Sequence, residues 1–458
     1  MIRALVFDYG GVLMRTVNPL PRRELERWLG LPAGEADRLV FENPLWNEVQ
    51  LGRAGTADFW ADVGQRLGLD AEGLTEFQRG FWAGDRLDEE LVALIRHLRR
   101  EGYRTALLSN GPAGLHGHLE HLGIVDAFDA VVVSGSEGLM KPAPAIFERM
   151  LARLGILPEE AVFVDDLREN VAGARQAGLH AVRFRGLAPL RGRLREVGVG
   201  VPDPVRAPVP GVRAVIFDWG GVLEELPDDE DTAAWERRLA LAPGTLPGIL
   251  FGEEWRQLEL GALGEDAYLQ SVAGRLGFPG AEAVLRFFGE FYMQKRLIPQ
   301  VVTAAHALRG RYKVALLTNA FPGQDDQIRQ NWGLDVHAEF DAYVNSSYVG
   351  LCKPDPAIFH LMLERLGVAP EQAIFVDDNL HNVDSARQLG LHTVQFVDAA
   401  TSLGELEALL GHPVQIANSK SANRQISKSA TAISLKTHGI NWNLSRVVHI
   451  GDVESPTG

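Results

Sequence analysis

The sequence has 458 residues, a formal net charge of −15 at pH 7 and 46% hydrophobic residues. At roughly 100–200 residues per domain, this length predicts two or three domains with sizeable apolar cores. The acidic balance argues against a broad nucleic-acid surface, which would need basic residues. Because the chain has a single cysteine, Cys352, a disulfide framework and a cysteine-rich metal site are both excluded.

The sequence also lacks the patterns of membrane insertion and export. No apolar run approaches the roughly 18–20 residues of a membrane span. The N-terminal stretch MIRALVFDYGG runs directly into a strand pattern and contains no signal-peptide cleavage site. We therefore expect a cytoplasmic protein that has neither a membrane nor a nucleic acid as its partner.

Short β-rich runs alternate with helical patterns over the first 196 residues. Strands are predicted at 2–8, 104–108, 130–133 and 161–164, and helices at 88–101, 113–122, 143–154 and 168–177. This alternation predicts an α/β fold with a Rossmann-like parallel sheet and helices on both faces. Segment 15–85 differs, because it has Trp, Leu and Phe at helical spacings and no strand signal. It predicts a helical cap inserted after the first strand.

The same pattern is then written a second time. Five stretches return at an offset of 209–212 residues: FDYGGVL as FDWGGVL, WNEVQLG as WRQLELG, ALLSN as ALLTN, KPAPAIF as KPDPAIF, and FVDDLRENV as FVDDNLHNV. An offset this steady indicates two whole domains of one fold. Two like domains also allow an intramolecular pseudo-dimer.

The repeat and the composition together predict the domain boundaries. We expect a first domain at 1–196 with its cap at about 15–87, and a second at 212–411 with its cap at about 225–297. The proline-rich stretch 197–211 is predicted to be an extended linker. Residues 412–458 are rich in Ser, Asn and Lys without periodicity, which predicts a disordered tail.

Polar side chains that can take part in catalysis or ligand binding follow the predicted strands. Asp8 ends the first strand, Ser109 ends TALLS, and Asp165 and Asp166 end AVFVDD, while Lys141 opens a helix on a neighbouring connection. In open parallel α/β sheets, ligands bind outside the carboxyl ends of the strands. The fold would thus gather three carboxylates, one hydroxyl and one ammonium in a single crevice.

This set of groups suits phosphoryl transfer. Clustered carboxylates repel one another unless a cation sits among them, and Mg²⁺ prefers such oxygen ligands. A hydroxyl, a backbone turn and a lysine would bind the remaining phosphate oxygens, and an aspartate can attack as a covalent nucleophile. Only seven of the 45 basic residues are lysines, so a lysine at this place indicates a need for its compact ammonium.

These motifs, in this order, resemble the haloacid dehalogenase-like (HAD) hydrolase superfamily over nearly all of residues 1–411, in both copies. The resemblance is greatest to sugar-phosphate phosphatases that read FDxGNV or FDxGGV, whose helical cap belongs to the first cap class. It implies an enzyme that hydrolyses small phosphomonoesters with Mg²⁺ through an aspartyl-phosphate. The residues that it implies are the nucleophiles Asp8 and Asp218; the phosphate-neutralising lysines Lys141 and Lys353; the phosphate-binding Ser109, Asn110, Thr318 and Asn319; and the metal-side acids Asp165, Asp166, Asp377 and Asp378.

The sequence departs from the superfamily at one position. Most of its phosphatases carry a second aspartate two residues after the nucleophile, which protonates the leaving group, but here Gly10 and Gly220 stand there. Their backbone carbonyls can still be metal ligands, but glycine cannot transfer a proton. General acid–base catalysis typically contributes about 10²–10⁴-fold to the rate. The domains should therefore be slow, favour good leaving groups such as anomeric sugar or aryl phosphates, or recruit a carboxylate from the cap.

Three further questions stay open at this point. Asp166 and Asp378 are the preferred direct metal ligands, while the other acid of each pair could do no more than accept backbone hydrogen bonds. A dehalogenase would use the same aspartate on carbon without a metal, which leaves FVDD unexplained. Besides a phosphatase and a dehalogenase, the third alternative is a catalytically weak module that binds phosphorylated ligands or forms a scaffold. Gly10 and Gly220 favour this alternative.

Overall fold

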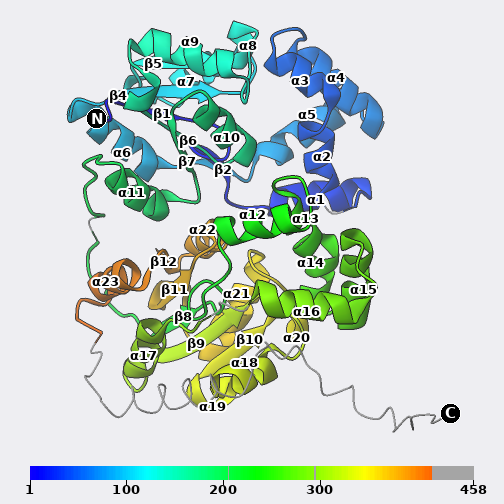
Figure 1. The fold of residues 1–458 in the computed structure, drawn as a ribbon, viewed down its shortest axis with the longest axis vertical. Coiled ribbons are helices and arrows are strands. Elements are labelled where there is room, and N and C mark those ends of the chain that lie inside the picture. The colour runs from blue at the N-terminus through cyan, green and yellow to red at the C-terminus, as the bar shows by residue number, and fades with distance from the viewer. Residues whose placement is uncertain (33, 205, 293–295, 415–458) are drawn as a thin grey trace, which may run out of the picture. The chain divides into compact units, whose positions relative to one another are not determined.

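The computed structural model describes residues 1–32, 34–204, 206–292 and 296–414. The chain divides into two compact units, Met1–Val205 and Arg206–Gly458, and the division falls within the predicted linker (Figure 1). The tail predicted from residue 412 onwards lies outside the described residues from position 415.

The core of unit 1 is a five-stranded parallel sheet with the order β5-β4-β1-β6-β7. Its strands are β1 (Ala4–Phe7), β4 (Arg104–Ser109), β5 (Ala130–Val133), β6 (Ala161–Asp165) and β7 (His180–Arg183). The four strands that the sequence predicts are confirmed. The pattern missed the edge strand β7, because HAVR is short and only partly buried and so lacks a continuous apolar run.

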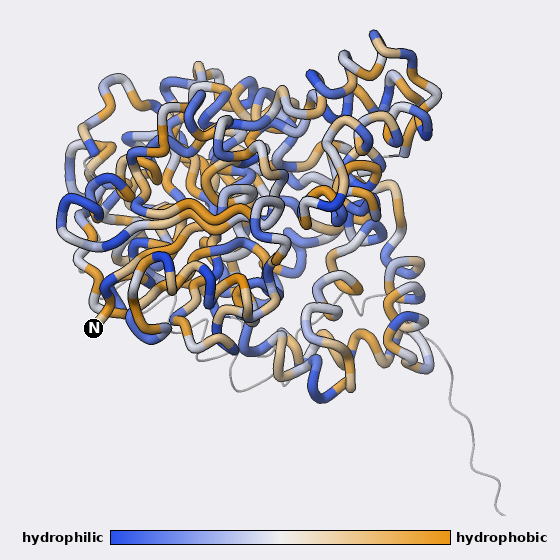
Figure 2. The backbone as a smooth tube through the Cα atoms, turned by 90° about the horizontal axis from the view of Figure 1, so that it is seen from above, coloured by the Kyte–Doolittle hydropathy of each residue, from blue (hydrophilic) through white to orange (hydrophobic). Residues whose placement is uncertain are grey.

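Alternate residues of the central strands face opposite helical layers. Val6, Leu108 and Phe163 point to one face, where they pack with residues of α9 and α10. Figure 2 shows neighbouring strands as the most hydrophobic stretches of the chain, as expected for a sheet that is covered on both sides. The helices of this layered domain are α6 (Glu89–Arg100), α7 (Leu115–His121), α8 (Ser134–Glu137), α9 (Pro144–Leu154), α10 (Arg168–Gln176) and α11 (Leu187–Glu196).

Unit 2 repeats this architecture with the strand order β10-β9-β8-β11-β12. Its strands are β8 (Ala214–Phe217), β9 (Lys313–Thr318), β10 (Ala342–Asn345), β11 (Ala373–Asp377) and β12 (His392–Gln395), all parallel. Its helices outside the cap are α17 (Pro299–Leu308), α18 (Gln324–Trp332), α19 (Val336–Glu339), α20 (Ser346–Val349), α21 (Pro356–Leu366), α22 (Leu380–Gln388) and α23 (Ala399–Leu410). The prediction of tandem Rossmann-like domains is therefore confirmed.

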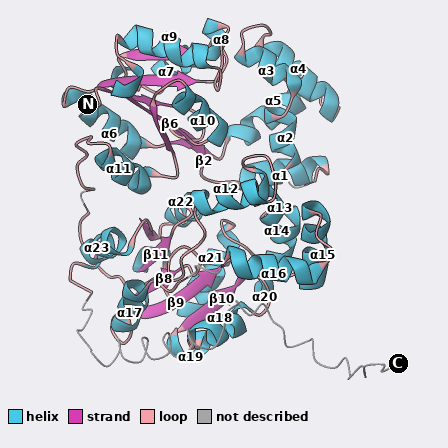
Figure 3. Cartoon of the chain, in the orientation of Figure 1, coloured by secondary structure: helices cyan, strands magenta, loops and turns pink. Residues whose placement is uncertain are grey.

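A helical cap with a small core of its own follows the first strand in each unit (Figure 3). In unit 1 it comprises α1 (Leu20–Leu29), α2 (Glu35–Phe41), α3 (Pro44–Gln50), α4 (Thr56–Leu67) and α5 (Ala71–Trp82). In unit 2 it comprises α12 (Asp229–Arg238), α13 (Thr245–Leu250), α14 (Glu253–Glu259), α15 (Glu265–Leu276) and α16 (Ala281–Phe291).

The expectation that segment 15–85 holds no strand is wrong at its two ends. β2 (Met14–Thr16) and β3 (Asp85–Leu87) form a short antiparallel ribbon at the base of the cap. Each is only three residues long, so neither shows an alternating pattern in the sequence. Their pairing joins the two points at which the chain leaves and re-enters the sheet domain.

The described helices are short, and the longest have 12 residues. Among the residues that the structure describes, no helix has the length and apolar character needed to cross a membrane.

The core of unit 1 offers a direct test of this packing. Phe147 of α9 is fully buried, and its ring lies edge-on to that of Phe163 at 5.2 Å. Phe147→Ala should lower the free energy of unfolding of unit 1 by about 3–5 kcal/mol, because it leaves a cavity. Calorimetry of the full chain should show this loss, while Leu157→Ala, at a site 58% exposed, should change little; equal effects of the two would contradict the packing.

Candidate active site

The candidate site lies where the order of the strands reverses. β1 is central: the chain continues from it to β4 and β5 on one side, and then crosses over to β6 and β7 on the other. Phe7 is level with Leu107 and Val164, so Asp8 follows at the carboxyl edge of the sheet beside Asp165. Ser109 ends the neighbouring strand β4 at the same edge and is buried. Such a switch point is where open α/β sheets bind ligands.

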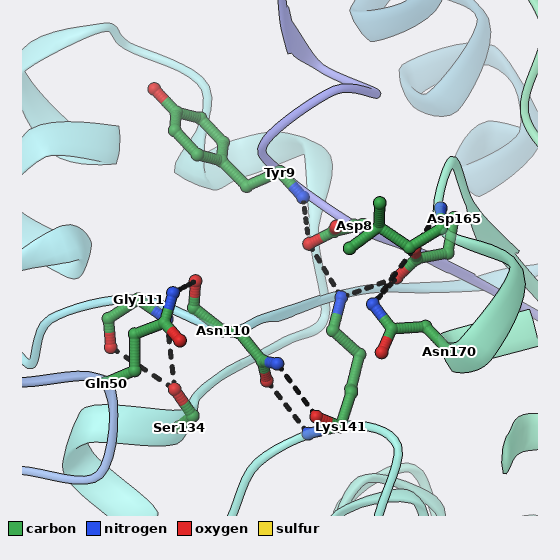
Figure 4. Close-up of polar contacts among 10 residues, drawn as sticks. Asp8, Tyr9, Gln50, Asn110, Gly111, Ser134, Lys141, Asp165 and Asn170 are labelled. Carbon is green, nitrogen blue, oxygen red and sulfur yellow. Dashed lines mark hydrogen bonds and ion pairs between the residues drawn. The ribbon is translucent and has the colours of Figure 1, made fainter. Parts of the chain in front are cut away.

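A buried lysine connects the ends of β1 and β6. Lys141 Nζ lies 2.8 Å from Asp8 Oδ1 and 2.6 Å from Asp165 Oδ2, and its side chain is 0% exposed (Figure 4). Burial alone would lower the pKa of Lys141, but the charges of the two aspartates outweigh it and raise the pKa. The lysine is therefore a positive charge held between two carboxylates.

Asn110 fixes the backbone of this lysine. Its Nδ2 donates to the Lys141 carbonyl oxygen at 2.9 Å, and its Oδ1 accepts from the Lys141 N–H at 2.8 Å. The next turn is secured by Ser134, whose Oγ accepts from the Gly111 N–H at 3.0 Å. Asn110, expected beside the phosphate, thus positions the lysine with its side chain.

The two acids at the end of β6 have different surroundings. Asp165 is completely buried and accepts from Lys141, from the Leu167 N–H at 2.9 Å and from Asn170 Nδ2 at 3.1 Å. Asp166 is only half-buried. The surroundings of Asp165 are those of an acid that orients the lysine, which leaves Asp166 the better candidate for direct ligation of a metal.

The carboxylates are close enough to share one cation. Oxygen atoms of Asp8, Asp165 and Asp166 all lie within 4.8 Å of one another. Gly11 lets Asp166 approach, because a Cβ at that position would lie 2.2 Å from Asp166 Oδ2 and the backbone there has a φ of 77°. The oxygen-only donor set fits a hard divalent cation such as Mg²⁺.

The electrostatics of the cluster favour a cation as well. Burial raises the pKa of Asp8 to about 7, and the nearby charges of Asp165 and Asp166 add to the effect against the opposing charge of Lys141. Burial and the charge of Asp165 raise the pKa of Asp166 to about 6. One ammonium does not compensate three carboxylates, so a divalent cation would stabilise their ionised forms.

The position of the missing second aspartate is open. Gly10 is exposed, and a Cβ there would meet no atom of the described residues within 4 Å. In unit 2, a Cβ at Gly220 would lie 3.6 Å from the side chain of Leu226, an ordinary contact. Neither glycine is required by the packing around it, so the absent carboxylate is a chemical feature of the site.

Unit 2 reproduces the arrangement closely. Lys353 Nζ lies 2.8 Å from Asp218 Oδ1 and 2.7 Å from Asp377 Oδ2. Asn319 clamps the Lys353 backbone at 2.8 and 2.7 Å, and Asn382 Nδ2 donates to Asp377 at 3.1 Å. The lysine bridge is therefore common to both units.

The remaining predicted residues of unit 2 also lie at this edge. Oxygen atoms of Asp218, Asp377 and Asp378 lie within 4.8 Å of one another, and burial raises the pKa of Asp218 well above its ordinary value. Thr318 ends β9 and is buried. A Cβ at Gly221 would lie 2.4 Å from Asp378 Oδ2, as at the first site.

Two further asparagines, Asn170 and Asn382, belong to the site although the motifs did not predict them. Both donate to the buried aspartate at the end of the strand next to the central one, β6 or β11. The repeated pattern FVDDxxxN carried the signal, since the asparagine keeps its spacing in both copies. Four residues after Asp166 or Asp378, it lies one helical turn into α10 or α22, facing back towards the strand.

Comparison with known families agrees with this geometry. The family model "haloacid dehalogenase-like hydrolase" matches residues 2–178 and 212–390, which is most of the chain and both units. The chain belongs to the haloacid dehalogenase-like hydrolases. The resemblance to this superfamily is thereby confirmed for each half of the chain.

Proteins of known name match parts of the chain. Acyl-CoA dehydrogenase family member 10 of Mus musculus is 34% identical over 214 residues, 44% of this chain and 20% of the mouse protein. Sesquiterpene phosphatase astK of Aspergillus oryzae is 27% identical over 179 residues, 39% of this chain and 87% of the fungal protein. The match thus spans about a fifth of the mouse relative and most of the fungal one.

Solved structures of the family are similar over one unit's length. A HAD-like family hydrolase from Porphyromonas gingivalis has 27% identity and a TM-score of 0.36, over 43% of this chain and 98% of that one. L-2-haloacid dehalogenase from Xanthobacter autotrophicus has 25% identity and a TM-score of 0.32, over 43% and 84% of the two chains.

The acidic clusters predict a pH-dependent effect of Mg²⁺ on stability. Since burial raises the pKa of Asp8 to about 7 and that of Asp166 to about 6, protons compete with a cation below pH 6. Well above pH 7 the acids are ionised, and a cation at 100 times its Kd should add about 2.7 kcal/mol. Calorimetry with and without Mg²⁺ should show the larger shift in Tm at the higher pH.

The double variant Asp166→Asn, Asp378→Asn is the control for this experiment. It keeps both lysine bridges but removes one carboxylate from each cluster, so most of the Mg²⁺-dependent stabilisation should disappear. A shift of the same size in the variant, or at both pH values, would contradict a metal site at these acids.

Proposed function

We propose that each unit is a Mg²⁺-dependent phosphatase that hydrolyses small phosphomonoesters through an aspartyl-phosphate on Asp8 or Asp218. The observation that carries the proposal is the buried lysine bridge beside a third carboxylate, at the switch point of the sheet, in both units. The site offers a nucleophile, a fixed positive charge and an acidic cluster within a few ångströms. Phosphoryl transfer needs little more than such positioning and charge neutralisation.

The aspartate is held ready for attack. Asp8 Oδ1 accepts from the Tyr9 N–H at 2.7 Å and from Lys141 at 2.8 Å. Both donors use Oδ1, so these contacts leave Oδ2 free to attack phosphorus. Asp218 is held in the same way by the Trp219 N–H and Lys353. The ester oxygen then leaves, and a water molecule later releases phosphate from the aspartate.

Charge would be balanced from two sides of the phosphoryl group. The lysine ammonium, whose backbone is held by Asn110 or Asn319, lies 2.8 Å from the nucleophile and can neutralise an equatorial oxygen. The hydroxyl of Ser109 or Thr318, at the end of the adjacent strand, can donate to another. Mg²⁺ held by the acid cluster would supply the remaining positive charge.

The named activities of relatives support phosphate esters as substrates. The fungal relative that is matched over 87% of its length is a sesquiterpene phosphatase. Shorter matches include the phosphoserine phosphatase of Thermus thermophilus, 41% identical over 103 residues, 22% of this chain and 41% of that protein. A carbon–halogen hydrolase would leave the acidic cluster of each unit without a role, and we rank it lower for that reason.

Removing the nucleophiles should abolish phosphate release. Asp8→Asn and Asp218→Asn should each stop turnover in one unit, and the double variant should lower total release by at least about 10³-fold. Phosphate release over a panel of phosphomonoesters with Mg²⁺ measures this, with Asp266→Asn, at an exposed cap position, as the control. Binding of phosphate analogues without turnover by the wild type would instead indicate a binding module.

Introducing the second aspartate should accelerate the hydrolysis of esters that have poor leaving groups. Gly10→Asp places a carboxyl group two residues after the nucleophile, and the free space there accommodates it. In the Asp218→Asn background, alkyl phosphates should be hydrolysed up to about 10²–10⁴-fold faster, because the leaving oxygen receives a proton. Aryl phosphates should gain far less; an equal gain for both would contradict the role assigned to the glycine.

A further inference from the structure

The two caps differ chemically at one equivalent position. Helices α3 and α14 carry the repeated stretches WNEVQLG and WRQLELG, and their last residues are Gln50 and Glu259. The side chains have nearly the same size and reach. A carboxyl group can give and take a proton near neutral pH, however, whereas an amide cannot.

A glycine turn seats the end of each of these helices against the sheet domain of its own unit. A Cβ at Gly52 would lie 2.2 Å from the Gly135 carbonyl oxygen, and one at Gly261 would lie 2.5 Å from that of Ser347. These carbonyls belong to α8 and α20, which directly follow β5 and β10. The ends of α3 and α14 therefore lie at the carboxyl edge of the sheet, where the site is.

In unit 1 the position reaches the site through a backbone contact. Gln50 Nε2 donates to the Asn110 carbonyl oxygen at 3.5 Å, a long hydrogen bond. Figure 4 shows Gln50 next to Asn110 and Gly111, on the strand end that also fixes Lys141. The last residue of α3 thus contacts the end of β4, where the predicted phosphate-binding residues Ser109 and Asn110 lie.

In unit 2 the equivalent carboxyl group lies near the reacting centre. Glu259 is half-buried and close enough to Lys353 for the ammonium charge to lower its pKa. That ammonium is itself 2.8 Å from Asp218 Oδ1, the proposed nucleophile. Because Glu259 ends the cap helix that Gly261 seats against Ser347, its carboxyl group approaches this lysine from the cap.

The surroundings keep this carboxyl group able to exchange a proton. Burial raises the pKa of Glu259 to about 7, against a hydrogen bond from Trp255 and the charges of Lys353 and Arg256. Burial raises the pKa of Tyr268 on α15, and the nearby charge of Glu259 adds to this effect. A group with a pKa near the working pH is present in both protonation states, as a general acid and base requires.

We propose that Glu259 is the acid–base group of the second site, in place of the carboxylate missing at Gly220, and that Gln50 leaves the first site without one. This inference rests on the proposed phosphatase function. The two units would then share a nucleophile, a lysine and a metal cluster but differ in proton transfer. Unit 2 would turn over esters with poor leaving groups, and unit 1 only those with good ones.

The proposed steps balance in protons and bonds. As Asp218 Oδ2 attacks and the P–O bond to the leaving group breaks, neutral Glu259 gives its proton to the leaving oxygen and becomes a carboxylate. In the second step this carboxylate takes a proton from water as the water oxygen attacks phosphorus. The P–O bond to Asp218 then breaks, which releases phosphate and restores both side chains.

Variants that silence one unit at a time test the inference. In the Asp8→Asn background, Glu259→Gln should lower the turnover of an alkyl phosphate by about 10²–10⁴-fold and that of an aryl phosphate by much less. The ratio of the two rates separates loss of proton transfer from misfolding, because a folding defect would lower both alike. Glu253→Gln, at an exposed position of the same helix, is the matched control.

The reverse exchange tests unit 1. In the Asp218→Asn background, Gln50→Glu should raise the turnover of alkyl phosphates, and an unchanged rate would overturn the assignment for this unit. In unit 2, Glu259→Gln should also remove the limb near pH 7 from the pH profile. An unchanged rate ratio and pH profile in Glu259→Gln would overturn the role of Glu259 alone, whereas absence of phosphate release from the wild type would overturn the phosphatase function itself.

Discussion

An ammonium buried between two carboxylates is the contact on which each site depends. Lys141 and Lys353 have side chains that are 0% and 1% exposed, and each bridges the aspartate after the first strand to the aspartate at the end of β6 or β11. A buried charge of this kind is tolerable only when it is paired, and removing one partner of a buried pair typically costs about 3–5 kcal/mol. The bridge therefore fixes the nucleophile and ties together neighbouring strands at the same time. Each lysine is also held at its backbone by an asparagine side chain.

The bridge also explains why the two consecutive aspartates of each unit have different roles. Each buried aspartate, Asp165 or Asp377, is occupied by the lysine, an asparagine and a backbone N–H. The following aspartate is more exposed and faces a glycine that makes room for it. The cluster as a whole carries more negative charge than its single ammonium compensates. That imbalance is what makes a divalent cation the natural complement of the site.

The two units share the lysine bridge but differ in the cap helix next to it. The distances from the lysine to its two carboxylates agree within 0.1 Å between the units. The cap helix above the site, in contrast, ends in Gln50 in one unit and in Glu259 in the other. A change from amide to carboxyl group preserves size and packing but alters proton transfer, so two sites of one architecture can differ in rate and in choice of leaving group.

The sequence by itself determined the α/β class, the two copies, four of the five sheet strands of the first unit and the polar residues at the strand ends. It could do so because buried parallel strands are continuous apolar runs, and because the residue after such a run must lie at the carboxyl edge of the sheet. Only the tertiary structure identified β7, the β2–β3 ribbon and the partners of each acid, since short or half-exposed strands leave no periodic signal. It alone showed that Lys141 occupies Asp165 while Gly11 makes room for Asp166, and it alone brought Glu259 towards Lys353. These relations depend on distances through space between residues far apart in the chain, and local sequence patterns do not encode such distances.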